Sequence, residues 1–320
     1  MSDPDSRATI MASKAYICHA KHYIQEVKDV AMRTRTGGYP IGFRRGGGEW
    51  QSDLGELVQW AATNGLEVID LRKDAPEVGR IATEAGLRIG SVDLLDNKSM
   101  ISADKGKRAE AVAANAEYVK QCAKFGTVNH FLVMLPDDPA LPRAENFGYM
   151  VESFGELAPV LERHNARLAI EGWPGPGALC CTPEGYRALF REIPSPVMGI
   201  NYDPSHLIRM DIDHLRFLEE FVDRVYHVHG KDAQHLVEAY YEYGREQPAT
   251  FAKPEPYSGM TWRYTIPGHG VARWAEIFRT LEANNYNGCV SIELEDRNFY
   301  REAEAEREGI LQGARFLTGC

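Results

Sequence analysis

The feature that most constrains the fold is a regular alternation of short apolar runs with longer helical patterns, from about residue 39 to the C-terminus. Runs of this length and composition are typical of buried strands, and the segments between them have apolar residues at helical spacing. The predicted strands are Ile41–Arg44, Leu66–Leu71, Leu87–Leu94, Val128–Leu135, Arg167–Glu171, Val197–Asp203, Val225–His229 and Cys289–Glu293. The predicted helices cover 53–64, 77–85, 105–125, 146–164, 183–191, 212–221, 272–284 and 300–317.

Eight strand-then-helix units predict an α/β protein with a (β/α)8 barrel, formed as one domain over residues 39–320. The alternative is a doubly wound open sheet, which would carry a glycine-rich phosphate loop after an early strand. Residues 46–48 are three glycines in that position, but they lack the G-x-G-x-x-G spacing. Residues 1–38 are predicted to form an N-terminal tail and a helix over 19–34.

One connection is much longer than the others. Residues 232–270 separate the seventh strand from the next helix and contain seven aromatic residues: Tyr240, Tyr241, Tyr243, Phe251, Tyr257, Trp262 and Tyr264. Long loops inside compact domains are usually functional, and this one would leave the barrel from the face that carries active sites. We therefore expect 232–270 to be a lid or a subunit contact.

The overall charge excludes some classes of partner. Lys plus Arg is 36 and Asp plus Glu is 46, which gives a net charge of −10. Such a protein is unsuited to wrapping nucleic acid, and no apolar run is long enough for a membrane span. The N-terminus has no signal-peptide pattern, and the six cysteines form no C-x-x-C pair. These observations predict a cytoplasmic protein with reduced thiols.

Four ionisable residues share one strand phase. Side chains of a strand alternate between its two faces, and in the last four strands the large apolar residues occupy one face. In a barrel that face packs on the outer helices, so the opposite face lines the interior. The residues that point inward at the carboxyl ends of these strands are Glu171, Asp203, His229 and Glu293. Three carboxylates and an imidazole at one mouth predict a single divalent metal ion, because the carboxylates would otherwise repel each other.

The ligand types narrow the choice of ion. A set rich in oxygen with one nitrogen suits Mn²⁺ best, and Co²⁺, Mg²⁺ and Zn²⁺ are also possible.

The same region resembles the xylose-isomerase-like barrels, often called the sugar phosphate isomerase/epimerase family. The resemblance is carried by Ala169-Ile-Glu-Gly-Trp173, Asn201-Tyr-Asp-Pro-Ser-His-Leu207, His227-Val-His-Gly-Lys-Asp232, Ile266-Pro-Gly-His-Gly270 and Ser291-Ile-Glu-Leu-Glu-Asp296. It is strong from about residue 167 to 296, whereas the preceding chain shares only the rhythm of strands and helices.

The resemblance implies roles for particular residues. Glu171, Asp203, His229 and Glu293 match the metal ligands of the family, and the two glutamates match the groups that move protons in its epimerases. His206 matches a histidine that touches substrate oxygens. The family's ketose epimerases have a second glutamate where this chain has Gly177, and an arginine where it has His235.

Four further residues are candidates for substrate contacts. Trp173 could stack on a sugar ring, and Lys231, in phase with His229, could reach a substrate oxyanion or pair with Asp232 or Glu295. His130 on the fourth strand could be a base or a core histidine, and His269 could belong to the edge of the lid.

These residues predict an enzyme that removes a proton next to a carbonyl. A divalent ion would polarise the carbonyl and hold the enediolate, while a carboxylate takes the proton. We expect a sugar isomerase or epimerase, with a lyase on 3-keto sugars or 3-keto glycosides, including C-glycoside deglycosidases, as the alternative. A nuclease of abasic DNA and a sugar-binding protein without catalysis fit less well. We also expect a homo-oligomer, and a second type of subunit is possible.

Overall fold

The computed structural model describes residues 31–126 and 128–320. Its centre is a closed barrel of eight parallel strands in the order β1-β10-β7-β6-β5-β4-β3-β2. The strands are β1 (Ile41–Arg44), β2 (Val68–Leu71), β3 (Arg88–Asp93), β4 (Asn129–Val133), β5 (Arg167–Glu171), β6 (Met198–Tyr202), β7 (Val225–Gly230) and β10 (Val290–Ile292). The predicted (β/α)8 barrel is therefore confirmed, and the strand ends differ from the prediction by at most two residues.

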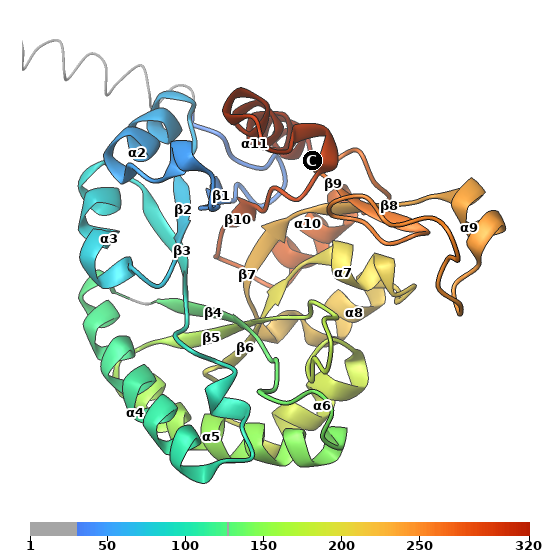
Figure 1. The fold of residues 1–320 in the computed structure, drawn as a ribbon. Coiled ribbons are helices and arrows are strands. Elements are labelled where there is room, and N and C mark those ends of the chain that lie inside the picture. The colour runs from blue at the N-terminus through green and yellow to red at the C-terminus, as the bar shows by residue number, and fades with distance from the viewer. Residues whose placement is uncertain (1–30, 127) are drawn as a thin grey trace, which may run out of the picture.

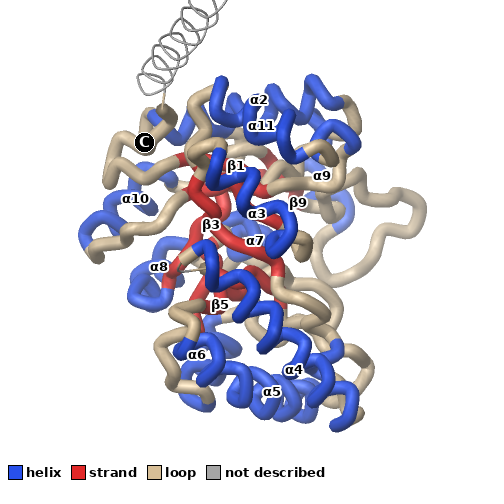
Figure 2. The backbone as a smooth tube through the Cα atoms, turned by 90° about the vertical axis from the view of Figure 1, so that its left-hand side faces the viewer, coloured by secondary structure: helices blue, strands red, loops and turns tan. Residues whose placement is uncertain are grey.

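Helices surround the barrel on its outside (Figures 1 and 2). They are α2 (Leu54–Thr63), α3 (Ala75–Glu84), α4 (Lys105–Cys122), α5 (Arg143–Arg163), α6 (Pro183–Glu192), α7 (Pro204–Arg209), α8 (His214–Phe221), α10 (Trp274–Ala283) and α11 (Ala303–Thr318). Short 3₁₀ turns lie at Glu49–Gln51, Ser99–Ile101, Ala123–Phe125, Val222–Arg224 and Arg297–Phe299. Among the described residues, no helix is long and apolar enough to cross a bilayer.

The core lies between the strands and the helices. Leu168, Ile170, Met198 and Ile200 are almost completely buried, as the alternation in the sequence predicts. Several helices begin at a side-chain cap: the carboxylates of Asp53, Asp104 and Asp213 accept backbone N–H groups of the first turn. Each cap satisfies a donor that the helix itself leaves unpaired.

The long connection has structure of its own, which the sequence did not predict. Strands β8 (Asp232–His235) and β9 (Trp262–Thr265) pair antiparallel, and α9 (Val237–Tyr243) lies between them in sequence. This segment projects from one side of the barrel in Figure 1. Its outer half exposes aromatic rings, whereas Tyr264 in β9 is buried.

The predicted helix over 19–34 lies mostly outside the described residues. Its last four residues are not helical, because Arg33 forms an isolated bridge with Pro40 instead.

Candidate active site

The carboxyl ends of four strands bring Glu171, Asp203, His229 and Glu293 together. Each offers one ligand atom, and these atoms all lie within 4.8 Å of one another. The first three residues are buried and Glu293 is half-buried. The arrangement is the one that the strand phase predicts.

Two of these residues have polar atoms without a hydrogen-bond partner among the described residues. Asp203 caps α7 with Oδ1, which accepts from the Ser205 backbone N–H at 2.9 Å and the Ser205 hydroxyl at 2.6 Å. Its other oxygen, Oδ2, accepts no hydrogen bond. His229 Nδ1 is 2.6 Å from Glu171 Oε2 and 3.4 Å from Glu293 Oε2, yet it forms no hydrogen bond with either.

This donor set fits a divalent cation. Two ligands at right angles on an ion with bonds of about 2.1 Å lie about 3 Å apart, because they form one edge of an octahedron. The separations around His229 Nδ1 scatter about that value. Buried polar atoms that form no hydrogen bond destabilise the folded state, and an ion bound by them would remove this cost.

The surroundings of the buried acidic and basic side chains in the site favour their charged forms. Burial alone would raise the pKa of Glu171, but His229 and His206 hold it well below its usual range. Burial would lower the pKa of Lys231, but Asp203, Glu293 and Glu295 raise it well above its usual range. Lys231 Nζ lies 3.2 Å from Asp203 Oδ2 and 2.9 Å from Glu295 Oε2, and it also contacts Glu293.

Behind these residues, a buried chain of contacts joins Glu171 to His229. Asn201 donates from Nδ2 to Glu171 Oε2 at 2.8 Å, and its Oδ1 lies 2.8 Å from His227 Nδ1. His227 Nε2 is 3.0 Å from Asp70 Oδ1, and Asp70 Oδ2 faces His229 Nε2 at 3.6 Å. If His229 binds an ion through Nδ1, its proton sits on Nε2, and Asp70 is the carboxylate that faces it. Such carboxylates orient metal-binding histidines.

His206 connects the site to the long connection. Its Nε2 lies 3.3 Å from Glu171 Oε1, and its Nδ1 lies 2.6 Å from the hydroxyl of Tyr264 in β9. Arg209 donates to the same hydroxyl at 2.7 Å and stacks on the ring of Trp262. The inner half of the 232–270 segment therefore forms part of the wall around the site.

The prediction that His130 contacts substrate is wrong. His130 pairs in register with Val92 and Leu168, so its side chain points to the helices, where it packs against Tyr118. Its neighbour Phe131 points inward instead, 5.3 Å from the His229 ring. His130 is the core histidine of the alternative interpretation.

Burial of His130 has a consequence for stability at low pH. Desolvation lowers its pKa to about 3, below the 6.5 expected in the unfolded chain. Between pH 6.5 and pH 3 the histidine is protonated in the unfolded state but stays neutral in the folded state. The free energy of unfolding therefore decreases as pH falls below about 6.5. In His130→Leu this contribution is absent, so we expect its free energy of unfolding to fall less steeply with decreasing pH, by up to about 1.4 kcal/mol per pH unit. Urea unfolding at pH 7 and pH 5 would test this, and equal pH dependence in both proteins would contradict it.

Two other predicted substrate contacts find no support in the geometry. His269 is exposed in the turn after β9, at the end of the 232–270 segment, and its contact with substrate stays a prediction. Trp173 follows β5 and is partly exposed, and it is not one of the four clustered residues, so its contact with substrate stays a prediction.

The structure also shows the surroundings of the two residues that depart from the ketose epimerases. Gly177 has φ of +76°, and a Cβ there would lie 2.8 Å from Pro139 and 2.9 Å from Pro136. No larger side chain fits this position without strain. His235 lies on β8, 3.9 Å from Asp211 and partly exposed.

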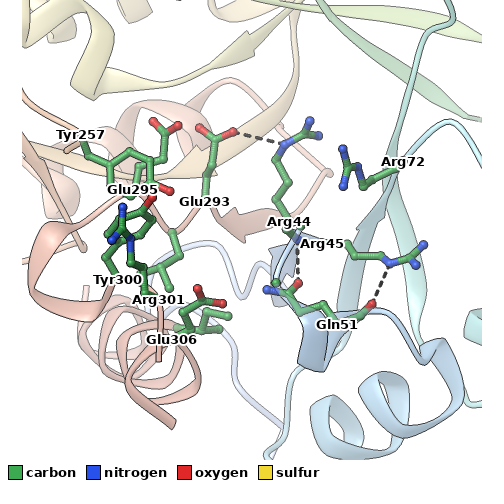
Figure 3. Close-up of a pocket in the computed structure, with 15 residues that line it drawn as sticks. Arg44, Arg45, Gln51, Arg72, Tyr257, Glu293, Glu295, Tyr300, Arg301 and Glu306 are labelled. Atoms are coloured by element: carbon green, nitrogen blue, oxygen red, sulfur yellow. Dashed lines mark hydrogen bonds and ion pairs between the residues drawn. The ribbon is translucent and has the colours of Figure 1, made fainter. Parts of the chain in front are cut away.

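A cavity of about 520 Å³ opens beside Glu293 (Figure 3). One wall carries Arg44, Arg45 and Arg72, and the other carries Tyr257, Tyr300 and Glu295. Its volume is within the roughly 300–1,000 Å³ of small-molecule sites. The sequence missed this cavity, and it also missed Asp70 and Asn201. Asp70 could have been found from the sequence, because it is a charged residue within an otherwise apolar predicted strand.

Comparisons with known proteins indicate a family and a fold. Residues 52–320 match the family model described as xylose isomerase-like TIM barrel. The inosose dehydratase of Lactiplantibacillus plantarum is 30% identical over 142 residues, 44% of this chain and 43% of that protein. The chain matches less than half the length of its curated relatives.

Two solved structures share the fold. The 3-keto-D-glucoside 4-epimerase of E. coli has a TM-score of 0.63 at 16% identity, covering 88% of this chain and all of that one. The IOLI protein with a bound zinc atom has a TM-score of 0.60 at 16% identity, covering 87% and 96%.

Proposed function

Because the chain belongs to the xylose isomerase-like TIM barrel family, we propose that it is a divalent-metal-dependent isomerase or epimerase of a sugar-like ketone. The observation that carries this proposal is the cluster of Glu171, Asp203, His229 and Glu293, in which Asp203 Oδ2 and His229 Nδ1 form no hydrogen bond within the described residues. These four residues would hold the ion. When bound, the ion would supply Lewis-acid polarisation of a substrate carbonyl.

Side chains of the site would carry out the proton transfers. Glu171 and Glu293 come from different strands, so one can take the proton from the carbon next to the carbonyl while the other returns one. Both stay ionised, because basic neighbours lower the pKa of each despite burial. The electron pair of the C–H bond moves into the new C–C double bond, and the carbonyl oxygen gains the negative charge. His206 Nε2 lies 3.3 Å from Glu171 Oε1, and from there it would donate to a substrate oxygen.

A lyase is the second candidate, and two observations favour it. Several curated relatives are inosose dehydratases. The site also holds Lys231, a buried cation beside Glu293 that could give a proton to a leaving group. Elimination would begin with the same proton removal and end with loss of water or an alcohol from the next carbon.

The test is exchange of the carbon-bound proton. Protein loaded with Mn²⁺ is incubated in deuterium oxide with D-fructose, D-psicose, inosose and 3-keto glucosides, and the products are followed by NMR. We expect deuterium next to the carbonyl of at least one compound. A retained ketose or aldose indicates isomerisation or epimerisation, and an unsaturated product or a released alcohol indicates the lyase. Isomerisation or epimerisation with no deuterium incorporation would contradict the first candidate, and the absence of an unsaturated product and of a released alcohol would contradict the second.

We further propose that residues 232–270 have two roles. The inner half covers the site through Tyr264, and the outer half is a contact surface in a homo-oligomer. Tyr241 and Phe251 are the basis of the second role, because their side chains are 88% and 98% exposed. Exposed aromatic residues are more frequent in interfaces than elsewhere on a protein surface.

Removing the two rings tests the contact without touching the site. We expect the double variant Tyr241→Ser, Phe251→Ser to have a lower mass in solution than the unaltered protein, by light scattering, with unchanged Mn²⁺ binding. A matched control replaces Val271, which is also exposed but lies beyond the segment, by serine. Equal masses for all three proteins would show that this surface is not an interface.

A further inference from the structure

The charges that line the cavity beside Glu293 are not balanced. Four arginines face it: Arg44, Arg45, Arg72 and Arg301. Arg44 pairs with Asp93 at 2.8 Å and with Glu293 at 3.2 Å, and Arg45 pairs with Asp74 at 2.7 Å. In the described parts of the chain, neither Arg72 nor Arg301 forms an ion pair.

Three carboxylates line the same cavity, those of Glu293, Glu295 and Glu306. Glu293 and Glu295 both contact Lys231. Glu306 accepts a hydrogen bond from Trp50 Nε1 at 2.7 Å. The side chains that line the cavity carry four positive and three negative charges, a net charge of +1, although the protein as a whole carries a net charge of −10.

The surroundings of Arg72 suit an anion. Arg72 follows β2 directly and lies on the same wall as Arg44 and Arg45 in Figure 3. Its guanidinium lies against the glycine loop, since a Cβ on Gly47 would be 3.5 Å from Arg72 Nη1. The backbone N–H groups of Gly47 and Gly48 donate to no other residue within 31–126 and 128–320. A guanidinium fork beside free N–H groups matches the oxygens of a carboxylate or phosphate.

We propose that this cavity binds an acidic sugar, with Arg72 holding its carboxylate or phosphate group and its carbonyl end toward Glu293. This inference rests on the proposed function for the carbonyl end, and it narrows the substrate class from sugars in general to sugar acids or sugar phosphates. Tyr257 and Tyr300, which pack edge to face 5.1 Å apart on the opposite wall, would contact the carbon chain between the two ends.

The binding test uses three ketoses that differ only at the far end: D-fructose, D-fructuronate and D-fructose 6-phosphate. Calorimetry is done on the whole protein with Mn²⁺ and again after chelation. We expect at least one of the two acids to bind about ten- to hundredfold more tightly than D-fructose, the range that hydrogen bonds between charged groups supply. The acid that binds more tightly identifies the anionic group.

Variants of Arg72 test the assignment itself. Arg72→Gln should remove most of the preference for the acid and leave D-fructose binding unchanged. Arg72→Lys should restore part of it, because the charge remains but the fork is lost. The control is Arg216→Gln, an exposed arginine of α8 outside the cavity that changes the net charge equally. Equal binding of acids and D-fructose, or equal effects of Arg72→Gln and Arg216→Gln, would overturn the proposal.

The outcomes separate this inference from the proposed function. An Arg72-dependent preference for an acid, with neither deuterium exchange nor formation of any product, would keep the anion site and contradict the proposed enzyme. Deuterium exchange on neutral ketoses, with no tighter binding of the acids, would support the proposed enzyme and contradict the anion site.

Discussion

Glu171→Gln and Glu293→Gln should each lower turnover by about two to four orders of magnitude, the usual contribution of general acid–base catalysis. Glutamine has nearly the size of glutamate and keeps an oxygen that can face a cation, but it cannot take up a proton. The Asn201 side chain donates to Glu171 at 2.8 Å, and it can still donate to the amide oxygen. We therefore expect both variants to fold and to retain some Mn²⁺.

The measurement must separate lost chemistry from lost metal. Each variant is assayed at saturating Mn²⁺, with metal content determined on the same sample, and deuterium exchange is followed beside product formation. The control is Glu110→Gln, an exposed glutamate of α4. If either site variant, with full metal, exchanged deuterium at the unaltered rate, its glutamate would not be a base. A variant that still exchanges deuterium into the substrate but forms no product keeps the glutamate that acts first and lacks the one that acts second.

The four clustered residues could be found from the sequence because their placement depends on local rules. Strand alternation fixed the inward phase of Glu171 and Glu293, and the closed barrel then required the ends of their strands to meet. No knowledge of side-chain contacts was needed for this step.

The chain behind the cluster could not be found in this way. Asp70 and His227 are 157 residues apart in sequence, and their 3.0 Å contact depends on how the closed barrel fills its interior. The Tyr264–His206 contact depends on a hairpin whose pairing has no clear sequence signal. His130 was misplaced because Phe131, a large apolar residue, fills the interior beside His229, contrary to the rule that large apolar residues face the helices.

The metal site has the largest expected effect on stability. His229→Ala should lose most of the bound Mn²⁺, because it removes the only nitrogen of the four-residue cluster. Binding to the folded state alone stabilises it, so Mn²⁺ should raise the melting temperature of the unaltered protein and leave that of His229→Ala unchanged. His164→Ala, at the end of α5 and outside the cluster, serves as the control. Full Mn²⁺ occupancy of His229→Ala, by elemental analysis, would contradict the assignment.

Asp70→Asn separates the direct ligand from the residue behind it. Burial would raise the pKa of Asp70, but His227 and His229 hold it well below its usual range, so the side chain is a carboxylate in the folded protein. Asparagine keeps the shape and removes the charge that faces His229 Nε2. Loss of such a partner typically weakens metal binding by about 10- to 100-fold, so we expect a higher dissociation constant for Mn²⁺ with stoichiometry kept at one. A variant that binds Mn²⁺ as tightly as the unaltered protein would show that Asp70 only supports the fold, and complete loss of binding would place Asp70 among the ligands themselves.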